Sequence, residues 1–245
     1  MDKNKLNGFI NKYHLGGEIK STKWESDGNK LSTRFISGDK SVVGSVTLDK
    51  FSELGACELG VYNTAQLTSL LSVLGDDVEL NLSKMGDKYV SVEMKDGKKG
   101  TTSKYMLSDL SVIPSPPPLK NLPKDFELSV KVDSYFIGTF INGKGALPEA
   151  ETFTIIADKD TEKVNIVIGF ANIASNRVTI PIEVVNFSDI PPVSFNANMF
   201  ASILSSNKEC QTATLKVSSA GLSKINFSID EYESEYYLVS TQQVS

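Results

Sequence analysis

The amino-acid sequence predicts an α+β fold of two similar domains, each with two helices packed on antiparallel sheets. Three observations predict this class. Segments with a helical spacing of apolar residues are followed by runs in which apolar and polar residues alternate one by one. A proline-rich segment lies near the middle of the 245 residues, and the two halves of the chain carry similar segments in the same order.

The helical pattern is clearest over residues 61–77, which read VYNTAQLTSLLSVLGDD. Four leucines recur here at i, i+3, i+4 and i+7, a spacing that places them on one face of a helix; they are Leu67, Leu70, Leu71 and Leu74. The opposite face carries hydroxyl and amide side chains and no charge before Asp76. Surface helices usually expose Lys and Glu, so the uncharged face needs an explanation.

The division into domains follows from residues 111–123, SVIPSPPPLKNLP, where five of thirteen residues are proline. A segment of this composition is stiff and extended. The sequence therefore predicts a first domain over residues 1–110, a connector over 111–123 and a second domain over 124–245.

The two halves also contain matching segments. Residues 62–72, YNTAQLTSLLS, align without gaps on residues 195–205, FNANMFASILS. Residues 104–108 match 236–240, and residues 8–14 parallel 135–141. The shared order indicates an internal duplication, and it predicts helices over about 3–15, 63–74, 131–144 and 196–207.

Period-two alternation predicts strands between these helices. The clearest runs are residues 31–36, 78–82, 164–168 and 222–229. Turn-forming residues separate them at 26–29, 86–87, 96–97 and 158–160. The repeated unit is thus a helix followed by an antiparallel meander, and it occurs four times.

The composition excludes several classes of protein and of site. Cys57 and Cys210 are the only cysteines, which excludes a disulfide framework and is typical of a reducing compartment. We expect both to be buried neutral thiols. His14 is the only histidine, so neither a histidine metal cluster nor a Ser-His-Asp triad can form. The N-terminal residues lack the apolar core of a signal peptide, and no stretch approaches the ~20 apolar residues of a membrane span.

Two segments resemble ligand-binding loops but lack their full patterns. Residues 141–149, INGKGALPE, lack phosphate-loop spacing, and we expect a helix end with Gly143 or Gly145 as its cap. Residues 158–162, DKDTE, lack the glycine of a calcium loop and are interpreted as a hairpin turn. We therefore predict no catalytic residue, no metal ligand and no cofactor: the protein is not expected to be an enzyme.

The lysines are distributed unevenly in this acidic chain. The predicted helical segments, extended to residue 208, contain six lysines and one acidic residue, Asp133, whereas the whole chain has a net charge of −5. One interpretation is that the lysines only solvate helix surfaces. The other is a surface that faces a polyanion, because attraction to phosphates is long-ranged and independent of base sequence. On this second interpretation, six lysines face duplex DNA: Lys3, Lys5, Lys12, Lys131, Lys144 and Lys208.

The helices, connector and repeat together resemble the sliding DNA clamps, and most closely the polymerase processivity factor of T-even-type bacteriophages, which is related in fold to proliferating cell nuclear antigen. The segments that carry the resemblance are LSTRFISG (31–38), VYNTAQLTSLLSVLGDDVELNLS (61–83) and EYESEYYLVS (231–240). By position, Lys5, Lys12 and Lys144 match basic residues of the family's inner lining. The third helix departs from the family pattern because it is poorer in Arg and Lys.

The resemblance implies two similar domains per subunit and a homotrimer closed into a ring, with helices lining the hole. It implies that the ring encircles duplex DNA, that a clamp loader opens it, and that the DNA polymerase docks on its outer face. The setting would be the cytoplasm of an infected bacterial host. The alternative is a phage structural or assembly protein with duplicated β-rich domains that does not bind DNA.

The connector also supplies a candidate pocket for the polymerase. Ile113, Leu119 and Leu122 are apolar residues on an extended segment, where they must pack down or meet a ligand. Tyr236, in the closing strand, is the fourth residue of this predicted partner pocket. The alternative is that the three connector residues only hold the segment on its own sheets.

Overall fold

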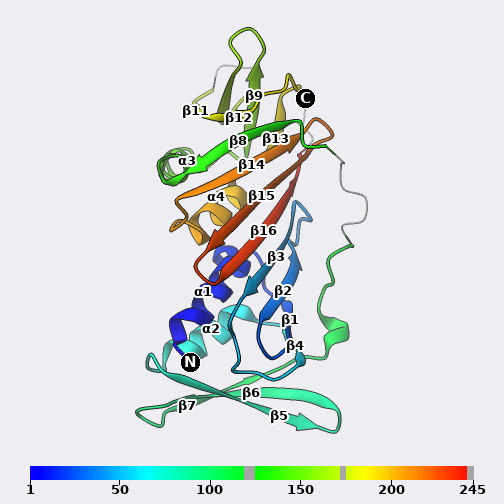
Figure 1. The fold of residues 1–245 in the computed structure, drawn as a ribbon, viewed down its shortest axis with the longest axis vertical. Coiled ribbons are helices and arrows are strands. Elements are labelled where there is room, and N and C mark those ends of the chain that lie inside the picture. Colours follow the sequence, from blue (N-terminus) through cyan, green and yellow to red (C-terminus); the bar gives the residue numbers. More distant parts are fainter. Residues whose placement is uncertain (119–124, 172–174, 242–245) are drawn as a thin grey trace. The chain divides into compact units, whose positions relative to one another are not determined.

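The computed structural model describes residues 1–118, 125–171 and 175–241 (Figure 1). The chain divides into two compact units. Unit 1 comprises Met1–Ser37, Gly44–Pro117 and Asp230–Ser234. Unit 2 comprises Gly38–Val43, Pro118–Ile229 and Glu235–Ser245. The division falls inside the predicted connector, and each unit also takes a short segment from the other half of the sequence.

Unit 1 contains two α-helices, α1 (Lys3–His14) and α2 (Thr64–Ser72), and two short 3-10 turns, η1 (Leu15–Gly17) and η2 (Leu110–Val112). One group of strands has the order β3-β2-β1-β4, and in it β1 pairs antiparallel with both neighbours. Its members are β1 (Thr22–Ser26), β2 (Leu31–Ile36), β3 (Val42–Leu48) and β4 (Cys57–Val61). A separate antiparallel sheet consists of β5 (Val78–Met85), β6 (Lys88–Asp96) and β7 (Thr102–Met106).

Unit 2 repeats this plan with α3 (Ser134–Ala146) and α4 (Ala197–Ser206). One group of strands has the order β12-β8-β14-β15-β16. Its members are β8 (Leu128–Asp133), β12 (Val184–Asn186), β14 (Thr212–Ser218), β15 (Leu222–Ile229) and β16 (Tyr232–Val239). A second antiparallel sheet has the order β11-β10-β9-β13, formed by β9 (Thr152–Asp158), β10 (Lys163–Ile168), β11 (Val178–Ile182) and β13 (Val193–Asn196). The predicted α+β class is confirmed.

Each unit has its own aromatic core between helices and sheet. In unit 1, Phe9 and Tyr13 of α1 meet Trp24 edge-on, and the Trp24 indole nitrogen donates to the Tyr13 hydroxyl at 3.2 Å. In unit 2, Phe136 and Phe140 of α3 occupy the aligned positions of the repeat, and both are buried. The duplication inferred from the sequence thus places equivalent aromatic residues in both cores.

Asparagine caps account for one part of the repeat. The side chain of Asn63 accepts a hydrogen bond from the Gln66 backbone N–H at 3.0 Å and begins α2. Asn196, the aligned residue, does the same for Met199 at the start of α4, also at 3.0 Å. A capping side chain satisfies a backbone donor that has no partner inside the helix, so the aligned asparagines fix equivalent helix starts.

The third helix begins later than predicted. Asp133 caps it by accepting from the Phe136 N–H at 2.8 Å, so α3 begins at Ser134. Residues Leu128–Asp133 form β8, which places Lys131 in a strand rather than a helix. The expectation that a glycine ends this helix is also wrong: α3 continues through Ala146 and its C-cap is Leu147. None of the helices in the described ranges is long and apolar enough to cross a membrane.

Candidate nucleic-acid interface

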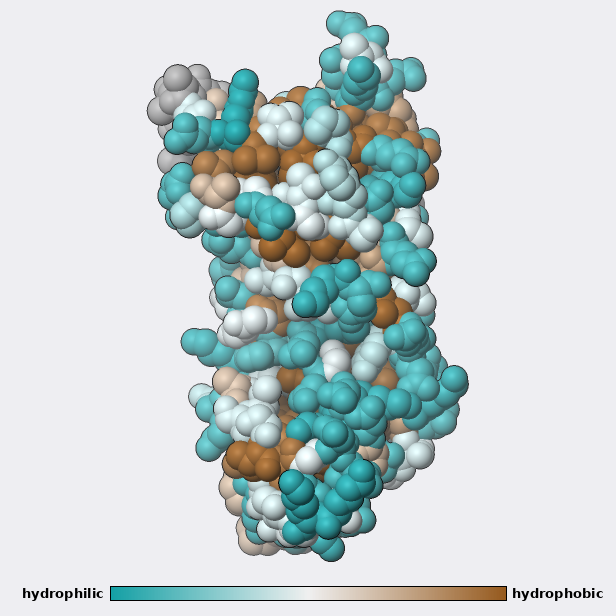
Figure 2. All heavy atoms as spheres, turned by 90° about the vertical axis from the view of Figure 1, so that its left-hand side faces the viewer, coloured by the Kyte–Doolittle hydropathy of each residue, from teal (hydrophilic) through white to brown (hydrophobic). Residues whose placement is uncertain are grey.

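The outward faces of α2, α3 and α4 are uncharged. Within the four α-helices, which lie in the described part of the chain, there is no Asp or Glu. Figure 2 views the side on which Figure 1 draws α3, and it shows pale residues of intermediate hydropathy among hydrophilic and apolar ones. The exposed residues of these three helices are Ala65, Gln66, Ser69, Ser72, Ser134, Tyr135, Gly138, Asn142, Gly145, Ala146, Asn198 and Ser205.

The hydroxyls of α2 bond to the helix itself. Thr68 donates to the Thr64 carbonyl at 3.0 Å, and Ser69 donates to the Ala65 carbonyl at 2.9 Å. Ser72 donates to the Ser69 carbonyl at 2.7 Å. Such back-bonding satisfies a hydroxyl donor locally. These hydroxyl groups of α2 therefore have donors that are already engaged within the helix.

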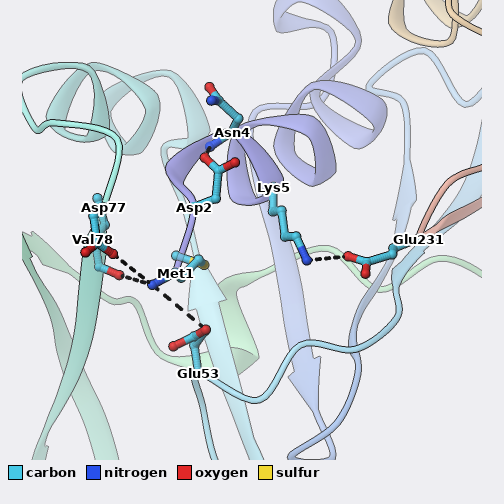
Figure 3. Close-up of polar contacts among 8 residues, drawn as sticks. All are labelled: Met1, Asp2, Asn4, Lys5, Glu53, Asp77, Val78 and Glu231. Carbon is cyan, nitrogen blue, oxygen red and sulfur yellow. Dashed lines mark hydrogen bonds and ion pairs between the residues drawn. The ribbon is translucent and has the colours of Figure 1, made fainter.

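Lys5 is the most exposed lysine of α1, and it forms an ion pair. Its Nζ lies 2.6 Å from Oε2 of Glu231 (Figure 3). The Nζ of Lys50 lies 3.8 Å from the other carboxylate oxygen. The hydrogen bond between Lys5 and Glu231 raises the pKa of the ammonium and lowers the pKa of the carboxyl. The Lys5 side chain is 45% exposed, so it reaches solvent while paired.

The segment that carries Glu231 also covers part of α1. The hydroxyl of Tyr232 donates to the Lys5 carbonyl at 3.0 Å. The ring lies against Gly8, where a Cβ atom would be only 2.5 Å from the tyrosine oxygen. Lys12 places its Nζ 5.1 Å from the ring centroid and is 1% exposed. The prediction that Lys12 faces DNA is therefore corrected, because this ammonium is buried against an aromatic ring.

Lys3 is half-buried at the start of α1, and its Nζ donates to the Leu74 carbonyl. Met1, two residues before Lys3, contacts the residues at the end of the loop between α2 and β5. The ammonium of Met1 lies 3.3 Å from the Asp77 carboxylate and 3.0 Å from the Val78 carbonyl oxygen (Figure 3). Lys3 thus helps to join α1 to the loop between α2 and β5, and its charge is partly engaged there.

The three lysines of unit 2 that were predicted to face DNA have different surroundings. Lys144 is 7% exposed, and its Nζ donates to the carbonyls of Leu147 at 3.3 Å and Pro148 at 2.8 Å. This corrects the prediction that Lys144 faces DNA, because the ammonium satisfies carbonyls at the end of its own helix. Lys131 pairs with Glu183 at 2.8 Å on the strand face, and Lys208 is exposed just after α4.

The predicted partner pocket is not open at the residues that the structure describes. Ile113 is buried, and it lies on the side of Gly60 in β4, where it would be 3.5 Å from an added Cβ. Tyr236 is 0% exposed; its hydroxyl accepts from the Asn207 side chain at 3.0 Å, and its ring contacts Phe227. Both are core residues, which corrects their assignment to a pocket wall. Leu119 and Leu122 lie outside the described residues.

A cavity of about 410 Å³ lies in unit 1 beside β4 and β6, and no motif in the sequence indicates it. Lys88 and Asp109 form an ion pair at its wall, and the hydrogen bond from Lys88 lowers the pKa of the Asp109 carboxyl. The lining residues are Glu58, Gly60, Asp87, Lys88, Tyr89, Val90, Leu107, Ser108, Asp109 and Leu110.

The cysteines have the surroundings of unreactive thiols. Cys57 is half-buried, and burial raises the pKa of its thiol. Cys210 is buried, with its Sγ 3.2 Å from the Thr212 carbonyl oxygen. Among the residues that the structure describes, no group of three or more His, Cys, Asp or Glu side chains could hold a metal ion.

The comparisons with known proteins identify the fold. No protein-family model matches the chain, and no curated protein matches its sequence. Among solved structures, the crystal structure of proliferating cellular nuclear antigen from Entamoeba histolytica is similar, with a TM-score of 0.74 at 15% sequence identity. The match covers 99% of this chain and 97% of that chain. The chain therefore has the fold of that antigen, with two similar domains.

Proposed function

We propose that this chain is a ring-shaped sliding clamp, which encircles duplex DNA and tethers the replicative DNA polymerase during replication of a phage genome. The observation that carries the proposal is the fold, which matches proliferating cellular nuclear antigen over 99% of the chain. The phage setting, in the cytoplasm of an infected bacterium, rests on the resemblance of residues 31–38, 61–83 and 231–240 to the T-even processivity factors.

The proposed ring is a homotrimer joined head to tail. Two similar units per chain give six similar units in three copies. Each unit has a sheet that ends in edge strands, β5 and β7 in unit 1 and β11 and β13 in unit 2. An edge strand offers unpaired backbone groups to another chain, and a heterologous contact between different edges closes into a ring if its rotation allows. A clamp loader would open one such contact, and the polymerase would bind the outer surface.

The proposed mechanism is topological. A closed ring cannot leave a circular duplex, so its contacts with DNA need not be strong. The revised set of DNA-facing lysines is Lys3, Lys5, Lys131 and Lys208, from which the two buried residues, Lys12 and Lys144, are removed. Attraction between exposed lysines and phosphates is screened by salt over about 10 Å. Such attraction can centre a duplex without holding it at one base pair.

The test compares linear and circular DNA. A fluorescent clamp is loaded on a nicked circular duplex, the circle is cut at one site, and the bound fraction is followed before and after cutting. We expect retention on the circle, with little sensitivity to moderate salt, and rapid loss after linearisation. The control is a linear duplex whose ends are blocked by bound protein, which should restore retention.

Equal dwell times on linear and circular DNA would contradict the topological mechanism. A protein that binds only through a basic patch would dissociate from both forms along the same steep salt curve. Absence of any retention, with loader and polymerase present, would favour the alternative of a phage structural or assembly protein.

A further inference from the structure

The contact between Lys5 and Glu231 engages a lysine that the proposed function assigns to DNA. Glu231 lies in Asp230–Ser234, the short segment from the second half of the sequence that belongs to unit 1. Its carboxylate is 2.6 Å from the Lys5 Nζ, a distance typical of a strong charge-assisted hydrogen bond. A phosphate that approaches Lys5 therefore meets an ammonium whose charge is already balanced by a carboxylate, and it competes with that carboxylate for the lysine.

The carboxylate is held in position by its backbone. The carbonyl of Glu231 accepts from the Asp49 N–H at 2.8 Å, and Asp230 before it has a left-handed φ of 52°. On the other side, the hydroxyl of Tyr232 donates to the backbone carbonyl of Lys5 itself. The close approach of Tyr232 to Gly8 fixes this segment against α1. Glu231 is thus an ordered partner for Lys5.

The ion pair is also able to exchange. The side chains of Lys5 and Glu231 are 45% and 25% exposed, so solvent and ions reach both. Exposed ion pairs contribute little net stability, because water screens them and both side chains lose conformational freedom. Lys50, whose Nζ is 3.8 Å from the same carboxylate, remains as a second partner when Lys5 leaves.

We propose that Glu231 is an intramolecular competitor of the DNA backbone for Lys5, and that this competition keeps the attraction of the clamp for phosphates weak. The inference rests on the proposed function and names a residue that sets the strength of its DNA contact. Removal of the carboxylate charge should release Lys5 to phosphates. Tighter contact should in turn slow the movement of the protein along the duplex.

The experiment measures equilibrium binding of a short fluorescent duplex by anisotropy, between about 50 and 200 mM salt, where phosphate contacts change affinity most clearly. The variants are Glu231→Gln, Glu231→Ala, Lys5→Met and Lys5→Met with Glu231→Gln. Asp189→Asn is the matched control: it removes one negative charge and releases Lys159, 3.6 Å away in unit 2, from another exposed pair. Thermal melting of each variant checks that it folds.

We expect Glu231→Gln and Glu231→Ala to bind about fivefold more tightly at the lowest salt, the ratio that corresponds to the upper end of an exposed ion pair. The salt dependence should steepen by roughly 0.9 for each lysine that gains a phosphate. In the Lys5→Met background the same change should have no effect, and Asp189→Asn should alter affinity by about twofold or less.

Three results would overturn the inference. An equal gain with Asp189→Asn would mean that overall charge is responsible, and an equal gain in the Lys5→Met background would mean that Lys5 is not involved. Equal affinity of wild type and both Glu231 variants at the lowest salt would show that Lys5, once released, does not gain a phosphate contact. The circular-DNA assay tests the proposed clamp function separately, since retention on a circle does not require measurable affinity for a short duplex.

Discussion

Tyr236 joins a buried polar contact to the aromatic core of unit 2. Its hydroxyl accepts from the Asn207 amide, and the same amide donates to the Ile203 carbonyl at 2.9 Å. Asn207 and Tyr236 are both fully buried. A buried donor that loses its acceptor keeps the desolvation cost of burial. The Tyr236 oxygen is therefore needed as the acceptor for the Asn207 amide, and it is buried too deeply to contact a partner protein.

Replacement of Tyr236 with Phe tests this assignment to the core. We expect the free energy of unfolding to fall by about 1–2 kcal/mol, because the amide of Asn207 loses an acceptor. Polymerase stimulation at a temperature where the variant is folded should stay unchanged. Urea denaturation and primer extension are the two measurements. Tyr135→Phe is the matched control, since it makes the same change at an exposed residue of α3 and should leave stability unchanged. Normal stability with weakened polymerase binding would return Tyr236 to the partner pocket.

Residue-level prediction from sequence succeeded for packing and failed for lysine environment. The aligned aromatic positions, Phe9 with Phe136 and Tyr13 with Phe140, are all buried. The burial of Lys12 depends on Tyr232, which is distant in sequence. No local pattern around Lys12 contains that information. Lys144 is different, because its position in the last turn of a helix is a known signal for capping of carbonyls.

At the level of elements, the two copies of the repeat share an asparagine cap, at the start of α2 in one copy and of α4 in the other. Asn63 and Asn196 each accept from the backbone N–H three residues later. Replacement by Ala removes the acceptor but leaves the helix interior unchanged. The two sites lie in different units, so they share no hydrogen-bonding partner.

We expect Asn63→Ala and Asn196→Ala each to cost about 1 kcal/mol and to combine nearly additively in the double variant, as independent sites do. Thermal denaturation and amide exchange of the first turn of each helix would measure the effect. Ser69→Ala is the control, because its hydroxyl only bonds back within α2 and its loss should cost no more than about 0.5 kcal/mol. Strong non-additivity would contradict the independence of the two caps.

The strands show what alternation can and cannot determine. Residues 31–36 and 222–229 were predicted as strands and form β2 and β15 with the same bounds. The start of α3 was placed too early, because residues 131–133 continue the alternation of β8 up to the capping Asp133. Asp is one of the residues favoured at an N-cap, immediately before a helix, so this boundary was available from the sequence.

For the whole molecule, the two-unit organisation leads to a prediction about assembly. Within the described residues, each unit has a separate sheet whose two edge strands pair on one side only. A head-to-tail contact between unlike edges either closes or forms filaments. We expect a closed trimer in solution, with a mass three times the 26.7 kDa of one chain, measured by light scattering after size-exclusion chromatography.

The chain concentration is the control for this measurement, because a closed ring keeps one mass over a range of concentrations whereas a filament grows. A two-fold dimer, or a monomer at micromolar concentration, would count against the ring. The internal repeat in the sequence could predict that each chain contains two similar units. It could not predict which edges stay open, because that depends on strand order, which is set by long-range pairing.

The assignment of Asp230–Ser234 to unit 1 also affects the order in which the protein can fold. A ribosome releases the first half of the chain long before this segment has been synthesised, and domains generally fold as they emerge. Here α1 lacks the Tyr232 side chain that packs on Gly8 until the first residue of β16 has left the exit tunnel. Contacts between residues so distant in sequence form late, because the intervening loop must first be closed. Unit 1 is therefore completed only after most of unit 2 has been synthesised.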